Sequence, residues 1–95
     1  MKIIWQTPAS LDLVAIAEYH AAVSPSFANL ILDRVEAQMP LLERFPFIGR
    51  SGHVAGTRER VVPGTPYILI YQIDQDEIVI LNILHGARNF PPEQV

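Results

Sequence analysis

The sequence predicts an α+β fold: an N-terminal strand, a helical hairpin, and a three-stranded antiparallel meander, with the helices packed on one face of the sheet. Two observations predict it. Apolar residues recur at helical spacing from about residue 9 to residue 42, and strand-like apolar runs follow from residue 57 to residue 84. At 95 residues the chain suffices for one hydrophobic core and is too short for two. We therefore expect a single domain spanning residues 1–95.

The first two elements are predicted by a β-branched start followed by a helix signal. Residues 2–6 are rich in Ile and Trp, which favours a strand. Thr7 and Pro8 then supply a capping oxygen and a proline suited to the first helical position. From Ala9 to about Ala22, apolar residues return every three or four positions. We expect a strand leading directly into a helix with one buried face.

A second helix follows after a short turn. Ser24 and Pro25 repeat the pairing of a capping residue with a proline, and an apolar stripe continues from Phe27 to about residue 42. The two helices should form a hairpin around residues 23–24. Pro40 lies inside the second stripe, where its missing amide and its ring disrupt a helix, so a bend is predicted near residues 38–39.

The second half of the chain changes to a strand pattern. Residues 45–56 contain three glycines and a proline and are predicted to be a loop. Strand-like segments cover residues 57–62, 67–73 and 77–84, separated by short turns. The last two segments are apolar at nearly every position, as in strands covered on both faces. Because the helices can cover only one face, we expect the other to meet the carboxyl-terminal tail, a partner chain or a second copy.

Composition excludes several classes of function. A net charge of −3 argues against a protein attracted mainly to phosphates. There is no Cys, so disulfides, thiolate nucleophiles and Cys-based zinc sites are absent, and the three His residues lie in three different predicted elements. We expect no metal and no cofactor. No apolar run reaches the length of a membrane span, and residues 1–6 do not have a signal-peptide pattern, so we expect no membrane partner, and the absence of Cys permits an intracellular location.

Arg58 and Arg60 are the first candidates for chemistry. They are two residues apart in a predicted strand, so alternation places both guanidinium groups on one face and Glu59 on the other. Two like charges on one face are tolerated when an anion sits between them, which would make this pair a site for a carboxylate, a phosphate or an acidic partner segment. The alternative is a solvated strand edge blunted by charge.

His85 and Arg88 follow the last predicted strand. Gly86 between them allows the backbone to turn, so that both side chains face one region. Imidazole can transfer protons near neutral pH, which would give His85 a chemical role. A single histidine at a strand end also packs well, and a structural role is the alternative.

Several segments, in order along almost the whole chain, resemble the RelE/ParE superfamily of toxins from bacterial toxin-antitoxin modules. They are Trp5-Gln6-Thr7-Pro8-Ala9, Phe45-Pro46 with Gly49-Arg50-Ser51-Gly52, Gly56-Thr57-Arg58-Glu59, Pro66-Tyr67-Ile68-Leu69-Ile70-Tyr71 and Ile83-Leu84-His85-Gly86-Ala87-Arg88. The resemblance implies a cytoplasmic toxin held inactive by a cognate antitoxin that wraps over the helices and sheet. Any operator DNA contact would then come from the antitoxin rather than from this chain.

The resemblance leaves two targets open. RelE-like members cut messenger RNA on the ribosome, and ParE-like members poison DNA gyrase. Arg58 and Arg60 lie at positions like those of the basic pair in the nucleases, with Arg88 after the last strand and His85 as a stand-in acid or base. However, Ile68 stands where the nucleases typically have Arg, and no Tyr follows Tyr71.

The "ILHGAR" ending instead resembles ParE-like proteins, and the acidic composition favours the same choice, because a protein that docks in a ribosomal cavity gains from excess positive charge. We therefore expect a non-enzymatic gyrase poison whose target contacts are Arg58, Arg60, His85 and Arg88. The alternatives are a ribosome-dependent, metal-independent endoribonuclease that uses the same four residues, and a toxin fold that has lost its activity and survives as an antitoxin-binding module.

Overall fold

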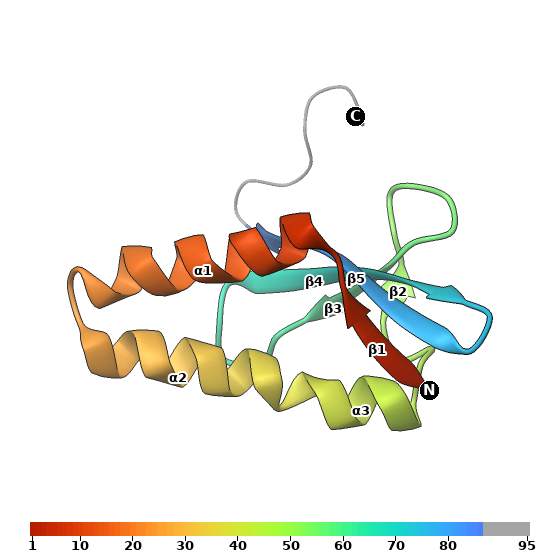
Figure 1. The fold of residues 1–95 in the computed structure, drawn as a ribbon, viewed down its shortest axis with the longest axis horizontal. Coiled ribbons are helices and arrows are strands. Elements are labelled where there is room, and N and C mark those ends of the chain that lie inside the picture. The colour runs from red at the N-terminus through yellow and green to blue at the C-terminus, as the bar shows by residue number, and fades with distance from the viewer. Residues whose placement is uncertain (87–95) are drawn as a thin grey trace.

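The computed structural model describes residues 1–86 and shows helices stacked on one face of a curved sheet (Figure 1). In chain order the elements are β1 (Lys2–Trp5), α1 (Thr7–Ala21), α2 (Pro25–Glu36), α3 (Gln38–Arg44), β2 (Arg50–Ser51), β3 (Arg58–Val61), β4 (Tyr67–Asp74) and β5 (Glu77–His85). The predicted α+β class, the helical hairpin and the meander of β3, β4 and β5 are confirmed.

The sheet is larger than the predicted meander. Its strand order is β1-β5-β4-β3-β2, with β1 parallel to β5 and the other neighbours antiparallel. The short strand β2 lies in the segment predicted to be entirely loop, and it pairs Arg50 with Glu59 and Ser51 with Arg58. Two residues carry too little periodicity to be recognised as a strand in a sequence.

The first helix begins at Thr7, one residue before the predicted first helical position at Pro8, so Thr7 is not its cap. The Gln6 amide still donates to the Ile80 carbonyl at 3.0 Å, so the sheet ladder runs directly into the helix. Gln6 is the N-cap residue without a side-chain bond, and Thr7 and Pro8 occupy the first turn. At the second helix the prediction is confirmed, because the Ser24 hydroxyl accepts a hydrogen bond from the Phe27 amide at 3.3 Å.

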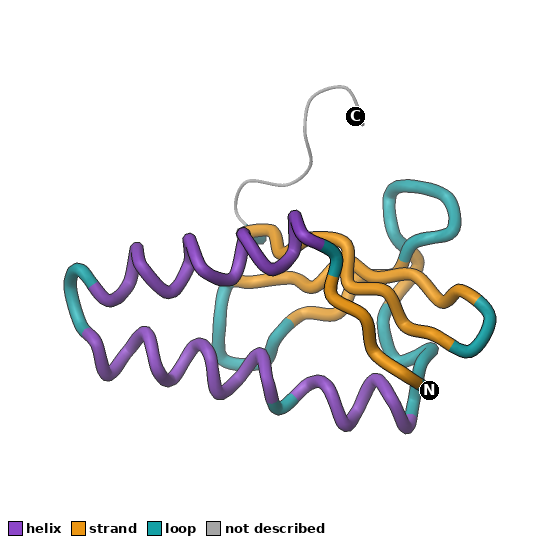
Figure 2. Tube along the Cα trace, in the orientation of Figure 1, coloured by secondary structure: helices purple, strands orange, loops and turns teal. Residues whose placement is uncertain are grey.

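The second apolar stripe divides into two helices, as the proline predicts. α2 ends at Glu36, Ala37 joins the two, and Pro40 is the third residue of α3. In that first turn its missing amide would have no intrahelical partner in any case. Figure 2 shows the break between the two helices.

One hydrophobic core lies between the helices and the sheet. Its buried members are Ala9, Ile31, Val35 and Leu42 from the helices, and Val62, Tyr67, Leu69, Tyr71, Ile78, Ile80 and Ile83 from the sheet region. Beyond the end of β1, the edge of β5 is hydrogen-bonded to α1. The Asp12 carboxylate accepts hydrogen bonds from the Ile83 amide at 2.9 Å and from the Asn82 side chain. None of the helices within residues 1–86 is long and apolar enough to cross a membrane.

Exposed apolar side chains gather on the helices and on the loop after α3. On the face of the sheet without helices, Ile70 and Val79 are only 7% exposed and Val61 is 47% exposed. The other large exposed apolar residues between residues 2 and 86 are Leu11, Val14, Tyr19, Val23, Phe27, Leu30, Leu41, Phe45, Phe47, Ile48 and Val54. The uncovered apolar surface was predicted on the sheet face without helices, whereas the exposed apolar side chains lie mainly on the helices and this loop. The carboxyl-terminal tail, one of its predicted covers, lies outside the described residues.

Candidate functional site

The register of β3 fixes the face on which the candidate arginines lie. Arg58 pairs with Tyr71 and Arg60 with Leu69, and both of these partners belong to the core beneath the helices. Paired residues share a face, so both arginines lie on the helix side of the sheet. Glu59 lies on the opposite side, as alternation predicts.

Arg60 is bound to a helix. Its Nε donates to Oε1 of Gln38 at 2.8 Å, and Gln38 is only 5% exposed at the start of α3. A buried amide oxygen without a donor is unfavourable, so Arg60 contributes to holding α3 on the sheet. This contact does not match the alternative interpretation, in which Arg60 is a solvated charge that only prevents further pairing at the edge of the sheet.

Arg58 is bound to the loop after α3. Its Nη1 donates to the Gly49 carbonyl at 2.7 Å and more weakly to the Phe47 carbonyl at 3.5 Å. Its guanidinium also lies over the Phe47 ring, 4.8 Å from the centroid, which is a cation–π contact. Arg58 therefore orders the loop and remains half-buried beside it.

Tyr71 binds the same loop after α3 from within the core. Its hydroxyl donates to the Pro46 carbonyl at 2.7 Å and accepts from the Gly49 amide at 2.9 Å, while its side chain is fully buried. Burial raises the pKa of this phenol, and the Gly49 amide and the charges of Arg58 and Arg60 only partly oppose the rise. Gly49 has no room for a side chain, because a Cβ would lie 2.8 Å from the Glu59 carbonyl oxygen.

The ordered loop encloses one side of a hollow of about 490 Å³. Phe47, Val54 and Ile73 contribute apolar walls, and Arg58 contributes the one charged side chain among the lining residues within 1–86. The segment between β2 and β3, which also lines the hollow, is ordered by its own hydrogen bonds from the Gly52 amide to the Thr57 carbonyl and from the Thr57 amide to the Val54 carbonyl.

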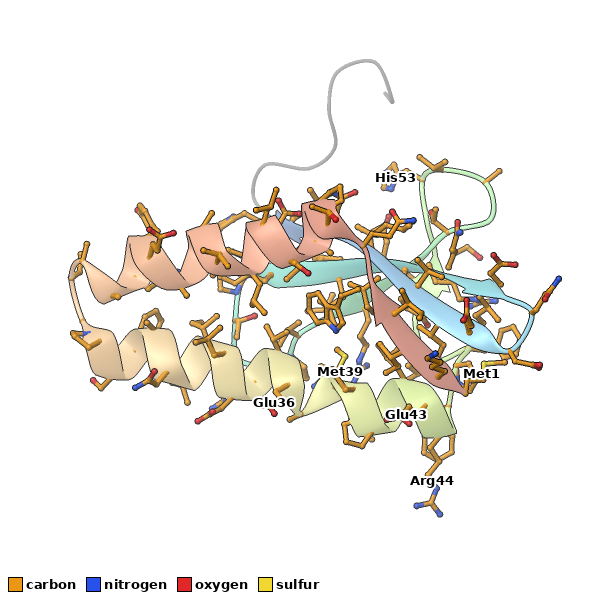
Figure 3. All side chains as sticks on the ribbon, viewed as in Figure 1. Met1, Glu36, Met39, Glu43, Arg44 and His53 are labelled. Atoms are coloured by element: carbon orange, nitrogen blue, oxygen red, sulfur yellow. The ribbon has the colours of Figure 1, made fainter. Side chains whose placement is uncertain are left out.

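Glu59 forms a second charged cluster on the helix-free side. Its side chain is 1% exposed and accepts bonds from Arg50 at 2.9 and 3.0 Å and from the His53 backbone amide at 3.2 Å, with the His53 Nδ1 3.0 Å away. Burial raises the pKa of the Glu59 carboxyl, but the bonds from His53 and Arg50 outweigh it, so the pKa lies below its ordinary value of 4.5. Figure 3 shows His53 on the loop between β2 and β3.

Sequence reasoning missed this cluster. The available signal was Glu59 itself, because a carboxylate between two arginines in a strand must point away from both and find cations elsewhere. Its partners come from the segment that was predicted to be featureless loop.

His85 lies at the other end of the sheet from Arg58. It pairs with Tyr67, and the two rings contact each other with centroids 5.4 Å apart. The Tyr67 hydroxyl lies 2.7 Å from Nε2 of His20, and burial raises the Tyr67 pKa. Since Tyr67 and Tyr71 are four residues apart in β4, about 13 Å separates the His85 and Arg58 ends. Arg88 lies outside the described residues.

The described candidates therefore do not converge on one point. Arg58 and Arg60 organise the loop and α3, and His85 belongs to an aromatic cluster with Tyr67 and His20. Within residues 1–86 there is no group of three or more His, Asp or Glu side chains placed to hold a metal ion.

Comparisons with known proteins show which family the sequence matches. A family model for the ParE toxin of the type II toxin-antitoxin system parDE matches residues 3–90. The "Putative toxin Y4kP" of Sinorhizobium fredii is 31% identical over 90 residues, covering 95% of this chain and 93% of that protein. Toxin RelE2 of Caulobacter vibrioides is 32% identical over 87 residues, covering 92% and 97%.

A solved structure shares the fold. A chain of the chromosomal ParDE TA system from P. aeruginosa superimposes with a TM-score of 0.83 at 25% sequence identity, covering 90% of this chain and 95% of that one.

Proposed function

Because the chain belongs to the ParE toxin family of type II toxin-antitoxin systems, with an antitoxin as its partner, we propose that its target is DNA gyrase. In this proposal the toxin is not an enzyme. It holds gyrase in a state with cleaved DNA, and the antitoxin prevents that contact in the cytoplasm.

The separation of the candidate groups is the observation that carries this proposal. Metal-independent cleavage of RNA needs a base for the 2′-hydroxyl, cations at the scissile phosphate and an acid for the leaving group, all within hydrogen-bond reach of one substrate. Here Arg60 is bound to Gln38, and His85 lies about 13 Å along the sheet from Arg58. That spacing suits contacts spread over a protein surface.

The opposite face of the sheet supports the same choice. Ile68 stands where the resembling nucleases have Arg, and it pairs with Val61 on the helix-free face. The nearby cation on that face, Arg50, already pairs with Glu59. A phosphate there would meet two aliphatic side chains and a neutralised ion pair.

One observation favours ribosome-dependent cleavage of messenger RNA as the second candidate. The relative at 32% identity carries the name RelE2, and His85 in contact with Tyr67 supplies an imidazole at the end of β5. In either case we propose Arg58, Arg60, His85 and Arg88 as the contacts to the target.

Induced expression without the antitoxin separates the candidates. We expect growth to stop, DNA double-strand breaks to accumulate and transcripts to stay intact. Loss of toxicity in Arg58→Gln, but not in Arg44→Gln, would support the assigned contact, since Arg44 points away from the sheet (Figure 3). Cut transcripts without DNA breaks would contradict the proposal. Unimpaired growth with abundant folded protein would indicate the inactive, antitoxin-binding module.

A further inference from the structure

We propose that the hollow beside Arg58 receives an acidic, apolar segment of the antitoxin. A carboxylate of that segment binds the Arg58 guanidinium, and a neighbouring apolar side chain packs against Phe47 and Ile73. The inference rests on the proposed function in one respect: with Arg58 as a contact to the target, the segment neutralises the toxin by covering that contact.

The guanidinium of Arg58 has one edge available. Its two hydrogen bonds within the described chain both leave from Nη1, toward the carbonyls of Gly49 and Phe47. Nε and Nη2 form the side-on edge of the group and donate to no acceptor among residues 1–86. That edge presents two parallel N–H donors, which match the two oxygens of a carboxylate.

Apolar side chains line the same hollow as Arg58. Phe47 is 66% exposed and Val54 is 45% exposed, and both line the hollow together with Ile73. The Phe47 ring already covers the Arg58 guanidinium at 4.8 Å, so a bound carboxylate would be partly shielded from water. A ligand that fills this site needs an apolar group next to its negative charge.

The charge distribution favours a protein segment over a nucleic acid. Binding to a phosphate backbone is driven by several unpaired cations acting together. Here the neighbouring Arg50 is paired with Glu59, and the whole chain carries a net charge of −3. One available guanidinium edge among apolar walls fits one carboxylate.

The walls of the hollow are ordered before any ligand binds. Tyr71 fixes the loop through Pro46 and Gly49, and hydrogen bonds of Gly52 and Thr57 close the segment from β2 to β3. Gly52 packs against the Thr57 side chain and has no space for a Cβ. A pre-organised site loses little conformational entropy on binding, which favours recognition of a short segment.

A small-molecule probe tests the site without the antitoxin or gyrase. The probe is 3-phenylpropanoate, which joins a ring to a carboxylate, titrated into the ¹⁵N-labelled full chain. We expect saturable shifts of the Gly52 and Thr57 amides. Affinity should fall at least 10-fold in Val54→Asp and Phe47→Ala. It should stay within 2-fold in the matched controls Val61→Asp and Phe45→Ala, whose wild-type residues are 47% and 52% exposed and do not line the hollow.

Two further probes identify the chemistry. Equal binding of 3-phenylpropan-1-ol would show that Arg58 takes no part, and tighter binding of phenyl phosphate would assign the site to nucleic acid; either result overturns the inference. With the purified cognate antitoxin, Val54→Asp should weaken the complex at least 10-fold and Val61→Asp should not. An unchanged complex would also overturn it. Probe binding by a chain that does not poison gyrase would refute only the proposed function.

Discussion

Replacing Tyr71 with Phe is the most informative single change to the fold around the site. The substitution removes one oxygen and leaves the ring in the core. That oxygen donates to the Pro46 carbonyl and accepts from the Gly49 amide, at 2.7 and 2.9 Å. Tyr71 is 0% exposed, so water cannot easily replace the lost partner.

The magnitude follows from the two groups left without a partner. Leaving a buried donor or acceptor unsatisfied costs about 1–3 kcal/mol, so Tyr71→Phe, which leaves two such groups, should lower the free energy of unfolding by roughly 2–6 kcal/mol. For a chain of this length the total is on the order of 5–14 kcal/mol. A domain of this size should lose at least about 8 °C in Tm.

Urea unfolding followed by circular dichroism measures this loss. The matched control is Tyr19→Phe, because Tyr19 is 73% exposed and should change stability by less than about 0.5 kcal/mol. Tyr71→Phe should also weaken binding of 3-phenylpropanoate, since the loop that carries Phe47 is no longer fixed. If both variants unfold at the same urea concentration, the Tyr71 hydroxyl does not hold the loop and this part of the account is refuted.

Three further predictions concern other named contacts. Because the pKa of the Glu59 carboxyl lies below 4.5 in the folded chain, the ionised carboxyl contributes its full stability above pH 4.5, and this stability is lost as the pH falls through the lower folded value. The urea midpoint should therefore decrease more steeply from pH 7 to pH 3 in wild type than in Glu59→Gln. Parallel curves for the two proteins would contradict this. Arg60→Met leaves the buried Gln38 oxygen without its donor and should cost about 1–3 kcal/mol in thermal unfolding, whereas an unchanged Tm would make Arg60 a surface charge. Ser24→Ala should cost about 1 kcal/mol through loss of the α2 cap, and an effect no larger than that of Ser26→Ala would count against the cap.

Local signals in the sequence were sufficient for the helices and the meander. Ser24 with Pro25 marked the start of α2, and Pro40 marked the break before α3, because both effects depend only on neighbouring residues. Thr7 was wrongly predicted to cap α1, which begins at Thr7 with Gln6 as its cap, because the pairing of Gln6 with Ile80 decides where the helix starts and that partner is distant in sequence.

The candidate site depended on contacts between distant segments. Alternation placed Arg58 and Arg60 on one face, but only the register with Tyr71 and Leu69 shows that this face lies under the helices. The partners of Glu59 belong to a two-residue strand and its loop, which have no periodicity. Local patterns therefore predicted the positions of the arginines but not what they bind.

A gyrase assay with purified components tests the central claim most directly. The full chain is added to gyrase and supercoiled plasmid, and linear DNA is measured after the protein is denatured. The account predicts that linear DNA accumulates with toxin concentration and disappears when the cognate antitoxin is added first. Unchanged supercoiling with no linear DNA, together with cut transcripts in a translating extract, would contradict it.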